Sequence, residues 1–325
     1  RAKLHRLLEF PLALLASALA PLILILLAIC DLAFLVAGRR NRSRPSVPNT
    51  GAASVVIPNW NGRDLLERYL PSVIAAISSN PANELIIVDN ASTDDSAQWV
   101  AEHFPQARLI RLATNAGFGE GCNIGVRAAR NDVVVLLNSD MAVEPGFLPP
   151  LLAGFSDPEV FAVSCQIFFT EPSRRREETG LTQFWWNSGH LRVRHQVDPA
   201  VGQLFPCGYP GGGSCALDRN KFLELGGFDR LFHPFYLEDT DLGYRAWKRG
   251  WKVLCQPRSR VYHQHRGTIG RTYSSTQIER ILGRNLLLFA WKNLHDWRQL
   301  AWHFLVLPPA FLASALAGAS RERPS

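Results

Sequence analysis

The strongest constraint on the fold is a repeated alternation of short apolar runs with helical patterns. The runs at 53–58, 84–90, 107–112 and 132–140 are rich in Val, Ile and Leu. After the first run, apolar residues recur at the 3.6-residue spacing of a helix, and Ser, Thr and Asp open the segment after the second. This alternation predicts an α/β fold with a Rossmann-like, mostly parallel sheet flanked by helices.

Polar clusters stand where three of the predicted strands end. They are Asn59-Trp60-Asn61-Gly62, Asp89-Asn90 and Asn138-Ser139-Asp140. Each alone could be a plain turn. Because ligands bind outside the carboxyl ends of parallel strands, the three together predict the rim of one binding site.

The glycine-rich loop TNAGFGEGCNIG does not fit a dinucleotide-binding fingerprint. Gly117-x-Gly119 would need a third glycine at the position of Cys122, and the loop follows the third strand rather than the first. The chain also lacks the GxxxxGK motif of a P-loop. The glycines therefore indicate a tight turn before a helix, and an oxidoreductase is disfavoured.

The first 50 residues predict a membrane anchor and a basic linker. Phe10 to Cys30 form a stretch of 21 uncharged residues, which could cross a bilayer of roughly 30 Å. Residues 1–44 hold seven basic and two acidic residues, which is +5 of the net charge of +7. Basic residues at the flanks of an apolar stretch favour a membrane, with the following domain in the cytoplasm, over nucleic acid as a partner.

Residues 273–325 predict an interfacial helix and a second membrane-embedded segment. Tryptophans and basic residues alternate there: Trp291, Lys292, His295, Trp297, Arg298 and Trp302. Such mixing is typical of a helix at a membrane interface. Residues 301–319 are almost all apolar, although Pro308 and Pro309 interrupt them. A packing helix outside any membrane is the alternative.

Six motifs in a fixed order resemble those of a known family. They are VVIPNWNG, IIVDNASTD, TNAGFGEGCNIG, LLNSDM, GGGSCALDRNKFLELGGFDRLFHPFYLEDTDLGYRAWKRGW and VYHQH. In this order, over residues 53–268, the chain is similar to the family 2 glycosyltransferases, nearest the rhamnosyltransferase-like branch. The resemblance implies a GT-A fold over residues 51–272, a nucleotide-sugar donor, a Mg²⁺ or Mn²⁺ ion, and inversion at the anomeric carbon.

The resemblance assigns a metal site to Asp140 and His263. Asp140 matches the last residue of the family's Asp-x-Asp motif, in which Asn138 replaces the first aspartate and removes one charge. His263 matches a histidine that completes the metal shell or contacts the diphosphate in several members, and His265 is the weaker candidate. An ion there would neutralise the charge that develops on the leaving diphosphate.

The resemblance also implies a set of residues that contact the nucleotide sugar. This set is Pro58, Asn59, Asn61, Asp89, Asn90, Asp94, Gly117, Gly119, Asn123, Asn138 and Ser139. Asp89 matches the aspartate that contacts the base or ribose. For Asp94, a cap on the following helix is an equal alternative.

Three carboxylates lie within four positions in the stretch LEDTDLGYR. A helix N-terminus would account for Asp241. By the resemblance, Asp239 is the base that takes the proton of the acceptor hydroxyl, with Glu238 as the runner-up. The acceptor side would include Gly212, Gly213, Arg245 and Trp247, although core packing is an alternative for the last two.

The sequence thus predicts a membrane-anchored, metal-dependent, inverting glycosyltransferase, most readily at a bacterial inner membrane. It would move a sugar from a nucleotide-sugar donor to a hydroxyl of a glycan or a lipid-linked acceptor. Two alternatives stay open. A polyprenyl-phosphate sugar synthase has a lipid phosphate as acceptor and needs no strong base. A non-catalytic nucleotide- or glycan-binding scaffold is favoured by the missing first aspartate.

Overall fold

The computed structural model describes residues 11, 15, 18–37, 46–170, 181–187, 189–196, 202–264 and 269–320. The chain divides into two compact units. The smaller unit comprises Arg1–Arg44, Trp185–Arg192 and Phe289–Ser325, and the larger comprises Pro45–Phe184 and Val193–Leu288. The predicted domain boundaries near residues 50 and 272 stay predictions.

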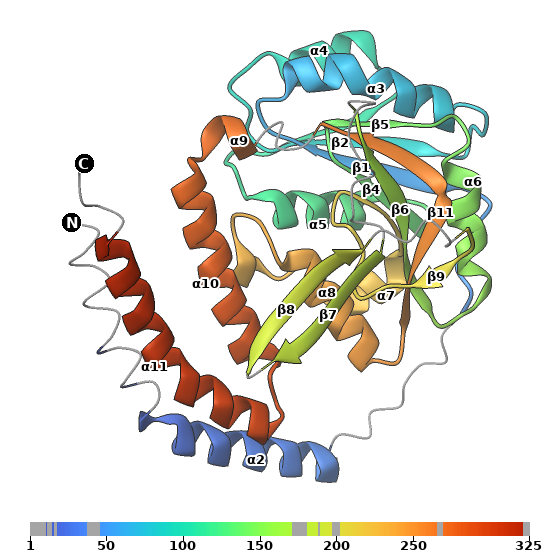
Figure 1. Cartoon of the computed structure of the whole chain (residues 1–325). Coiled ribbons are helices and arrows are strands. Elements are labelled where there is room, and N and C mark those ends of the chain that lie inside the picture. The colour runs from blue at the N-terminus through green and yellow to red at the C-terminus, as the bar shows by residue number, and fades with distance from the viewer. Residues whose placement is uncertain are drawn as a thin grey trace. The chain divides into compact units, whose positions relative to one another are not determined.

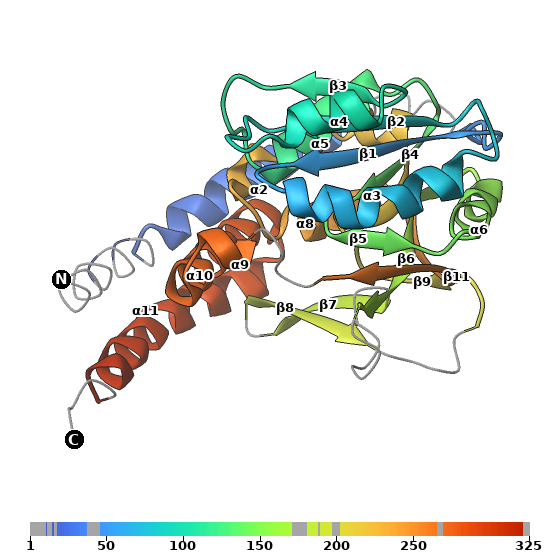
Figure 2. The ribbon, with the colours of Figure 1, turned by 90° about the horizontal axis from the view of Figure 1, so that it is seen from above.

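The parallel part of the main sheet is formed by the four strands that the sequence indicates. They are β1 (Ala53–Asn59), β2 (Glu84–Asp89), β3 (Arg108–Arg111) and β4 (Val133–Leu137). Their order is β3-β2-β1-β4, and each neighbouring pair is parallel. Figure 1 labels β2, β1 and β4, and Figure 2 also labels β3. Asn59 pairs with Asp89 across β1 and β2, so the polar ends of these strands meet at one edge. The predicted α/β class is confirmed.

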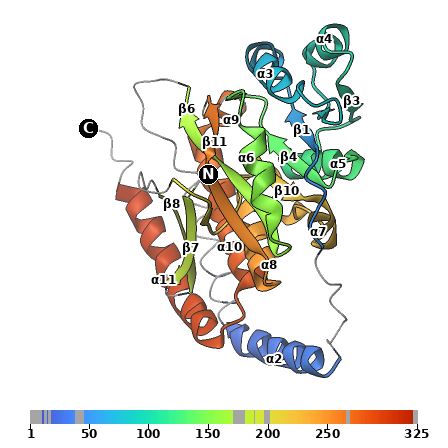
Figure 3. The same ribbon diagram turned by 90° about the vertical axis from the view of Figure 1, so that its right-hand side faces the viewer.

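The second half of the sheet contains antiparallel strands. They are β5 (Met141–Val143), β6 (Val160–Phe169), β9 (Phe205–Pro206), β10 (Ser214–Asp218) and β11 (Lys252–His263). β10 lies antiparallel between β4 and β6. β11 runs parallel to β6, as Figure 3 shows, and antiparallel to β5 and β9. The sheet therefore continues well beyond the predicted strands.

Helices cover both faces of the sheet. α3 (Arg63–Ile77), α4 (Ser96–His103) and α6 (Leu148–Ala153) pack on one face. α5 (Phe118–Ala128), α7 (Arg219–Glu224) and α8 (Glu238–Lys248) pack on the other, and Figure 2 shows β1 between α3 and α5. Strands enclosed between two helical layers must be apolar on both sides. All residues of β4 are buried accordingly.

Close packing of α5 on β1 explains one glycine of the glycine-rich loop. A Cβ atom at Gly125 would overlap the side chain of Val56 and would crowd that of Val88. The helix therefore lies directly on the sheet, where a larger residue would push it away. This packing fixes the start of α5 next to the polar strand ends.

The larger unit also contains the 3₁₀ turns η1 (Gly154–Ser156) and η2 (Arg230–Phe232) and helix α9 (Ile269–Thr272). β7 (Leu181–Asn187) pairs with β8 (His190–Gln196), and α10 (Ser275–Asn293) follows α9. The smaller unit contains α2 (Ala20–Ala37), α11 (Trp297–Ser320) and the end of α10. There, buried His303 accepts a hydrogen bond from Trp291 at 2.9 Å, and its Nδ1 lies 2.8 Å from the carbonyl oxygen of Gly189.

The predicted membrane location is wrong. Within the residues that the structure describes, no helix has both the length and the apolar character needed to cross a membrane. A span takes about 20 apolar residues, whereas α2 has 18 residues, among them Asp31. α11 has 24 residues but contains Arg298 and His303. The start of the predicted anchor, including Phe10, lies outside the described residues.

Helix α11 continues through Pro308 and Pro309, the two prolines that interrupt the apolar run.

Candidate active site

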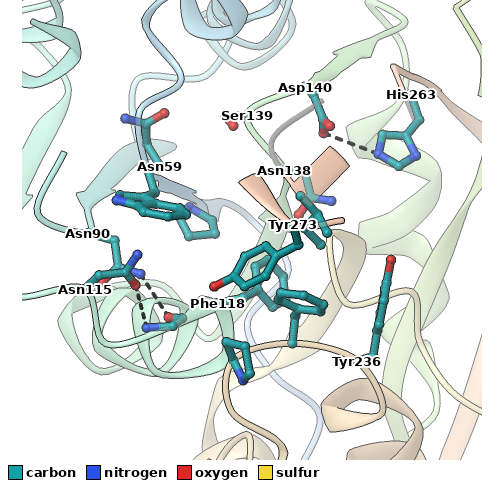
Figure 4. Close-up of a pocket in the computed structure, with 16 residues that line it drawn as sticks. Asn59, Asn90, Asn115, Phe118, Asn138, Ser139, Asp140, Tyr236, His263 and Tyr273 are labelled. Atoms are coloured by element: carbon teal, nitrogen blue, oxygen red, sulfur yellow. Dashed lines mark hydrogen bonds and ion pairs between the residues drawn. The ribbon is translucent and has the colours of Figure 1, made fainter. Parts of the chain in front are cut away.

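A cavity of about 230 Å³ opens at the carboxyl ends of β1, β2 and β4. Its polar wall carries Asn59 from β1, Asn90 after β2, and Asn138 after β4 (Figure 4). Pro58, Gly117, Ser139, Asp140 and His263 also line it. The structure therefore brings together the strand-end clusters predicted to share one site.

The first two strand ends present carboxylate and amide oxygens without partners. Asn59 donates to the hydroxyl of Ser96 at 3.0 Å, while its own Oδ1 is buried without a hydrogen bond. Oδ1 of buried Asp89 also has no hydrogen-bond partner. Because buried polar atoms are nearly always paired, such acceptors indicate a site that a ligand completes.

Asn90 holds the glycine-rich loop against this wall. Its amide donates to the carbonyl of Gly117 at 3.0 Å and accepts from the backbone N–H of Ala116 at 2.8 Å. Gly117 has a φ of 83°, and a Cβ there would collide with His233. The loop can approach the cavity only because position 117 is glycine.

Asn61 and Asp94 tie neighbouring loops to each other and do not line the cavity. Oδ1 of Asn61 accepts from the N–H of Thr93 at 2.7 Å. Asp94 accepts from the N–H groups of Arg63 at 3.0 Å and Ser96 at 3.1 Å. These bonds place Asp94 just before α4, whose N-cap residue is Asp95.

Asp140 and His263 face each other across the cavity wall. His263 Nε2 lies 3.3 Å from Asp140 Oδ1 (Figure 4), an ion pair only if the imidazole is protonated. The antiparallel register of β11 on β5 sets His263 opposite Met141, next to Asp140. His265, the weaker candidate, lies outside the described residues.

The Asn138-Ser139-Asp140 turn fits a divalent ion that a phosphate-bearing ligand helps to hold. Oδ1 of Asn138 and Oδ1 of Asp140 are both buried without hydrogen-bond partners. The described residues contain no group of three acidic, histidine or cysteine side chains that could hold a metal alone. Mg²⁺ commonly takes one or two carboxylates together with substrate phosphates and water, so the donor set present is sufficient.

Gly212 and Gly213 link this turn to the acidic start of α8. The N–H of Asn138 donates to the carbonyl of Gly213 at 2.9 Å, and a Cβ on Gly213 would overlap the Asn138 amide. The N–H of Gly212 donates to Asp239 Oδ2 at 3.1 Å. Two adjacent glycines therefore join the Asn138-Ser139-Asp140 turn to the Asp239 carboxylate.

The two acids at the start of α8 are buried to different degrees. Asp239 is half-buried and also accepts from the N–H of Thr240 at 2.6 Å. Glu238 is buried, its Oε2 has no hydrogen-bond partner, and it lines a small cavity next to the first with Pro234 and Gly119. Burial raises the pKa of Asp239, and burial together with the charge of Asp239 raises the pKa of Glu238 well above 4.5. A carboxylate with a raised pKa is a stronger base than an ordinary aspartate.

Arg245 and Trp247, expected on the acceptor side, make structural contacts instead of lining the cavity. Arg245 pairs with buried Asp241 at 2.7 Å and donates to the carbonyls of Leu225 and Gly227. Trp247 donates to the carbonyls of Cys207 and Gly208.

Asn123 and Gly119 lie on α5 beside the backbone of Phe228. Asn123 donates to the Phe228 carbonyl at 2.9 Å and accepts from its N–H at 2.8 Å. A Cβ on Gly119 would lie 3.2 Å from Phe228. Both residues therefore fix the loop after α7 and do not line the main cavity.

Sequence reasoning placed Trp60 in a strand-end cluster but missed the other aromatic residues of the cavity. Phe118, Phe235, Tyr236 and Tyr273 line it, together with Asn115, Pro234 and Ile269. Phe118, Phe235 and Tyr236 stand inside the quoted motifs, which is a usable signal. Tyr273 follows α9 and reaches the cavity only through the tertiary fold, so no local pattern indicates it.

Comparisons with known proteins agree with this site. The model of Glycosyl transferase family 2 matches residues 54–211, and that of Glycosyl transferase family group 2 matches residues 133–321. The chain belongs to the family 2 glycosyltransferases. It is therefore a nucleotide-sugar-dependent glycosyltransferase, as the six motifs imply.

One similar protein belongs to the rhamnosyltransferases. The chain is 27% identical over 257 residues to the N-acetylglucosaminyl-diphospho-decaprenol L-rhamnosyltransferase of Mycobacterium tuberculosis, covering 70% of this chain and 80% of that one. This likeness confirms the rhamnosyltransferase-like resemblance.

Two solved structures share the GT-A fold. GalNAc-T7 with UDP, GalNAc and Mn²⁺ aligns with a TM-score of 0.55 and 22% identity over 65% of this chain, which spans 43% of that one. The mannosyltransferase PcManGT of Pyrobaculum calidifontis, with GDP-Man and Mn²⁺, aligns with a TM-score of 0.50 and 19% identity over 97% of this chain and 88% of that one.

Proposed function

We propose that this glycosyltransferase is metal-dependent and inverting, and that its acceptor is a hydroxyl of a glycan or of a lipid-linked sugar. The observation that carries the proposal is the link through Gly212 and Gly213, which joins the Asn138-Ser139-Asp140 turn to Asp239. Donor and base groups thus lie on two sides of one backbone segment. We assign residues 51–272 to the catalytic domain.

The donor nucleotide occupies the strand-end wall. Unpartnered Oδ1 atoms of Asn59 and Asp89 accept hydrogen bonds from its base or ribose, and Asn90 keeps the glycine-rich loop in place beside them. The start of α5 lies at this loop, where backbone N–H groups favour phosphate. The aromatic residues opposite provide flat surfaces for a sugar or base.

A divalent ion would be held by Asp140, His263 and the amide oxygen of Asn138, together with the donor's phosphates. When bound, it neutralises the charge of the departing diphosphate. The Mn²⁺ in the two similar structures supports this assignment. Replacement of an aspartate by Asn138 leaves an oxygen ligand but removes one negative charge.

Asp239 takes the proton of the acceptor hydroxyl. The acceptor oxygen forms a bond to the anomeric carbon, the bond from that carbon to the phosphate oxygen breaks, and the nucleoside diphosphate leaves with the electron pair. The N–H of Gly212 keeps Oδ2 of Asp239 in position for this transfer. A hydroxyl acceptor needs a base to take its proton, whereas a lipid phosphate does not, so a base at Asp239 favours the hydroxyl. The mycobacterial relative, an N-acetylglucosaminyl-diphospho-decaprenol L-rhamnosyltransferase, supports a lipid-linked sugar as acceptor.

A donor panel tests the proposal. UDP-, GDP- and dTDP-activated sugars, with dTDP-rhamnose among them, are incubated with the enzyme, with Mn²⁺ or with EDTA. Release of nucleoside diphosphate from at least one donor, lost in EDTA and restored by Mn²⁺, is the expected result. Metal-independent release would contradict the metal assignment. Binding without turnover of any donor in Mn²⁺ would favour a scaffold.

A further inference from the structure

The segment before the acid pair has an unusual backbone. Tyr236 and Leu237 have φ values of 74° and 71°, although neither is glycine. The left-handed region is unfavourable for such residues, so their surroundings must hold them there. Two consecutive residues of this kind, directly before Glu238, set the direction in which α8 begins.

One buried side chain of α10 contacts this segment from behind. Asn285, which is 0% exposed, donates from Nδ2 to the carbonyls of Phe232 at 3.2 Å, Phe235 at 3.0 Å and Tyr236 at 2.9 Å. Its Oδ1 accepts from the Arg284 guanidinium at 2.8 Å, and Arg284 also donates to the carbonyl of His233. A single side-chain amide therefore donates hydrogen bonds to three carbonyls of one short loop.

The loop held in this way carries both the cavity lining and the acids. Phe235 and Tyr236 line the main cavity. The carbonyl of Leu237 accepts the N–H of Asp241 at 2.9 Å, which starts the hydrogen bonding of α8. A change in the Tyr236 or Leu237 dihedral angles would therefore turn the first residues of α8, Asp239 among them, relative to Gly212.

We propose that Asn285 is a positioning residue for the transfer reaction: it holds Tyr236 and Leu237 in the left-handed conformation and thereby aims the Asp239 carboxylate. This inference rests on the proposed function. The chemistry requires an amide, because only a side chain with two N–H donors and a separate acceptor can serve the carbonyls and Arg284 together. Aspartate would set oxygens against the carbonyls, and leucine would leave them without a donor.

Asn285→Leu tests the proposal with two readouts. We expect kcat for transfer to fall by about 10²-fold, the loss that a misplacement of about 1 Å can cause. The affinity for nucleoside diphosphate with Mn²⁺ should change far less, because its groups lie on the loops after β1, β2 and β4. Hydrogen exchange should rise in peptides covering 232–241 but not in those covering β1 or β4.

Asn83→Leu is the matched control. Asn83 also joins loops, since it donates to the carbonyl of Ile77 at 3.0 Å and accepts from the N–H of Ala53 at 2.9 Å, at the opposite end of β1. Its substitution should lower stability without the selective loss of kcat. If Asn285→Leu does not fold, Asn285→Ser, which keeps one donor, should show the same effects in weaker form.

Unchanged exchange over 232–241, or unchanged kcat despite faster exchange, would overturn the positioning role. Equal losses of kcat in Asn285→Leu and Asn83→Leu would also overturn it, because they would reflect general destabilisation. If the wild-type enzyme transfers from no donor, the proposed function fails, whereas the exchange measurement still decides whether Asn285 holds the loop.

Discussion

Glu120 on α5 and Glu238 on α8 are almost equally buried, at 9% and 7% exposure, yet their pKa values shift in opposite directions. Glu120 accepts hydrogen bonds from Arg127, Arg230 and Asn123, and chiefly the Arg230 bond lowers its pKa to about 2. No arginine or lysine in the described part of the chain pairs with Glu238, and burial raises its pKa. Burial alone therefore does not decide the charge; the partner does.

The same contrast occurs within one turn of α8. Asp241 is fully buried and paired with Arg245. Asp239 instead accepts hydrogen bonds from the N–H of Gly212 and from the N–H and hydroxyl of Thr240. The fold thus provides cations for the carboxylates that hold structure together. Among the described residues, no arginine or lysine forms an ion pair with Glu238, Asp239 or Asp140, and Asp140 lies 3.3 Å from His263 instead. This arrangement is expected where a proton or a metal must bind.

Among the carboxylates that lack a basic partner, substitution of Asp239 by Asn should have the largest effect on the transfer rate. The amide keeps the size and the contact with Gly212 but cannot take a proton. We expect kcat for transfer to fall by about 10² to 10⁴-fold, the usual contribution of a positioned base. Initial rates of product formation measure the loss. Asp241→Asn, the paired acid, should instead reduce thermal stability, and the reverse pattern would contradict the distinction between the two.

Asp140→Asn should weaken the response to metal. The change removes a carboxylate with an unpartnered oxygen and leaves only His263 and amide oxygens at the turn. We expect the Mn²⁺ concentration for half-maximal activity to rise at least 10- to 100-fold, the range known for weaker outer-shell changes. A Mn²⁺ titration of the rate checks this, and an unchanged midpoint would show that Asp140 does not hold the ion.

Glu238→Gln should remove a destabilising ionisation. Because the folded pKa of Glu238 is raised, the folded state binds the proton more tightly than the unfolded state does. The wild-type protein therefore loses stability as the pH rises from about 4.5 through the raised folded pKa. The variant should lose this part of the decline and unfold at a higher temperature than the wild type at pH 8. Thermal melts between pH 5 and 8 provide the test.

Glu120→Gln is the counterpart of Glu238→Gln, with a stability effect of opposite sign, and it should change stability the least. The lowered pKa of Glu120 stabilises the fold above pH 4.5, and this contribution is lost as the pH falls toward about 2. Its arginine partners are 51% and 77% exposed, so solvent screening limits the loss at neutral pH to about 1 kcal/mol. A higher melting temperature for Glu120→Gln would contradict the claim that its arginine partners make the charge of Glu120 stabilising.

Sequence patterns predicted the parts of the fold that depend on local information. β1 to β4, their helices and the polar residues at their ends all follow from periodicity and from the rule for parallel sheets. Asn59, Asn90, Asn138 and Asp140 are found together for that reason. The six motifs in addition indicated the family to which the chain belongs.

The remaining features depend on contacts between distant residues. His263 reaches Asp140 because β11 pairs with β5, and Asn285 reaches Tyr236 across 49 positions of the chain. No local pattern carries such pairings. The membrane prediction failed because apolar content near the ends was taken as a span, whereas the described helices fall short of one.

The pH dependence of kcat/KM tests the central claim, that Asp239 takes the proton. The wild-type rate should fall on the acid side with an apparent pKa above the ordinary 3.8 of aspartate, because burial raises the pKa of Asp239. Because burial and the charge of Asp239 raise the pKa of Glu238 well above 4.5, Glu238→Gln should keep this acid limb, and Asp239→Asn should abolish it. Loss of the limb in Glu238→Gln and its survival in Asp239→Asn would contradict the assignment and make Glu238 the base.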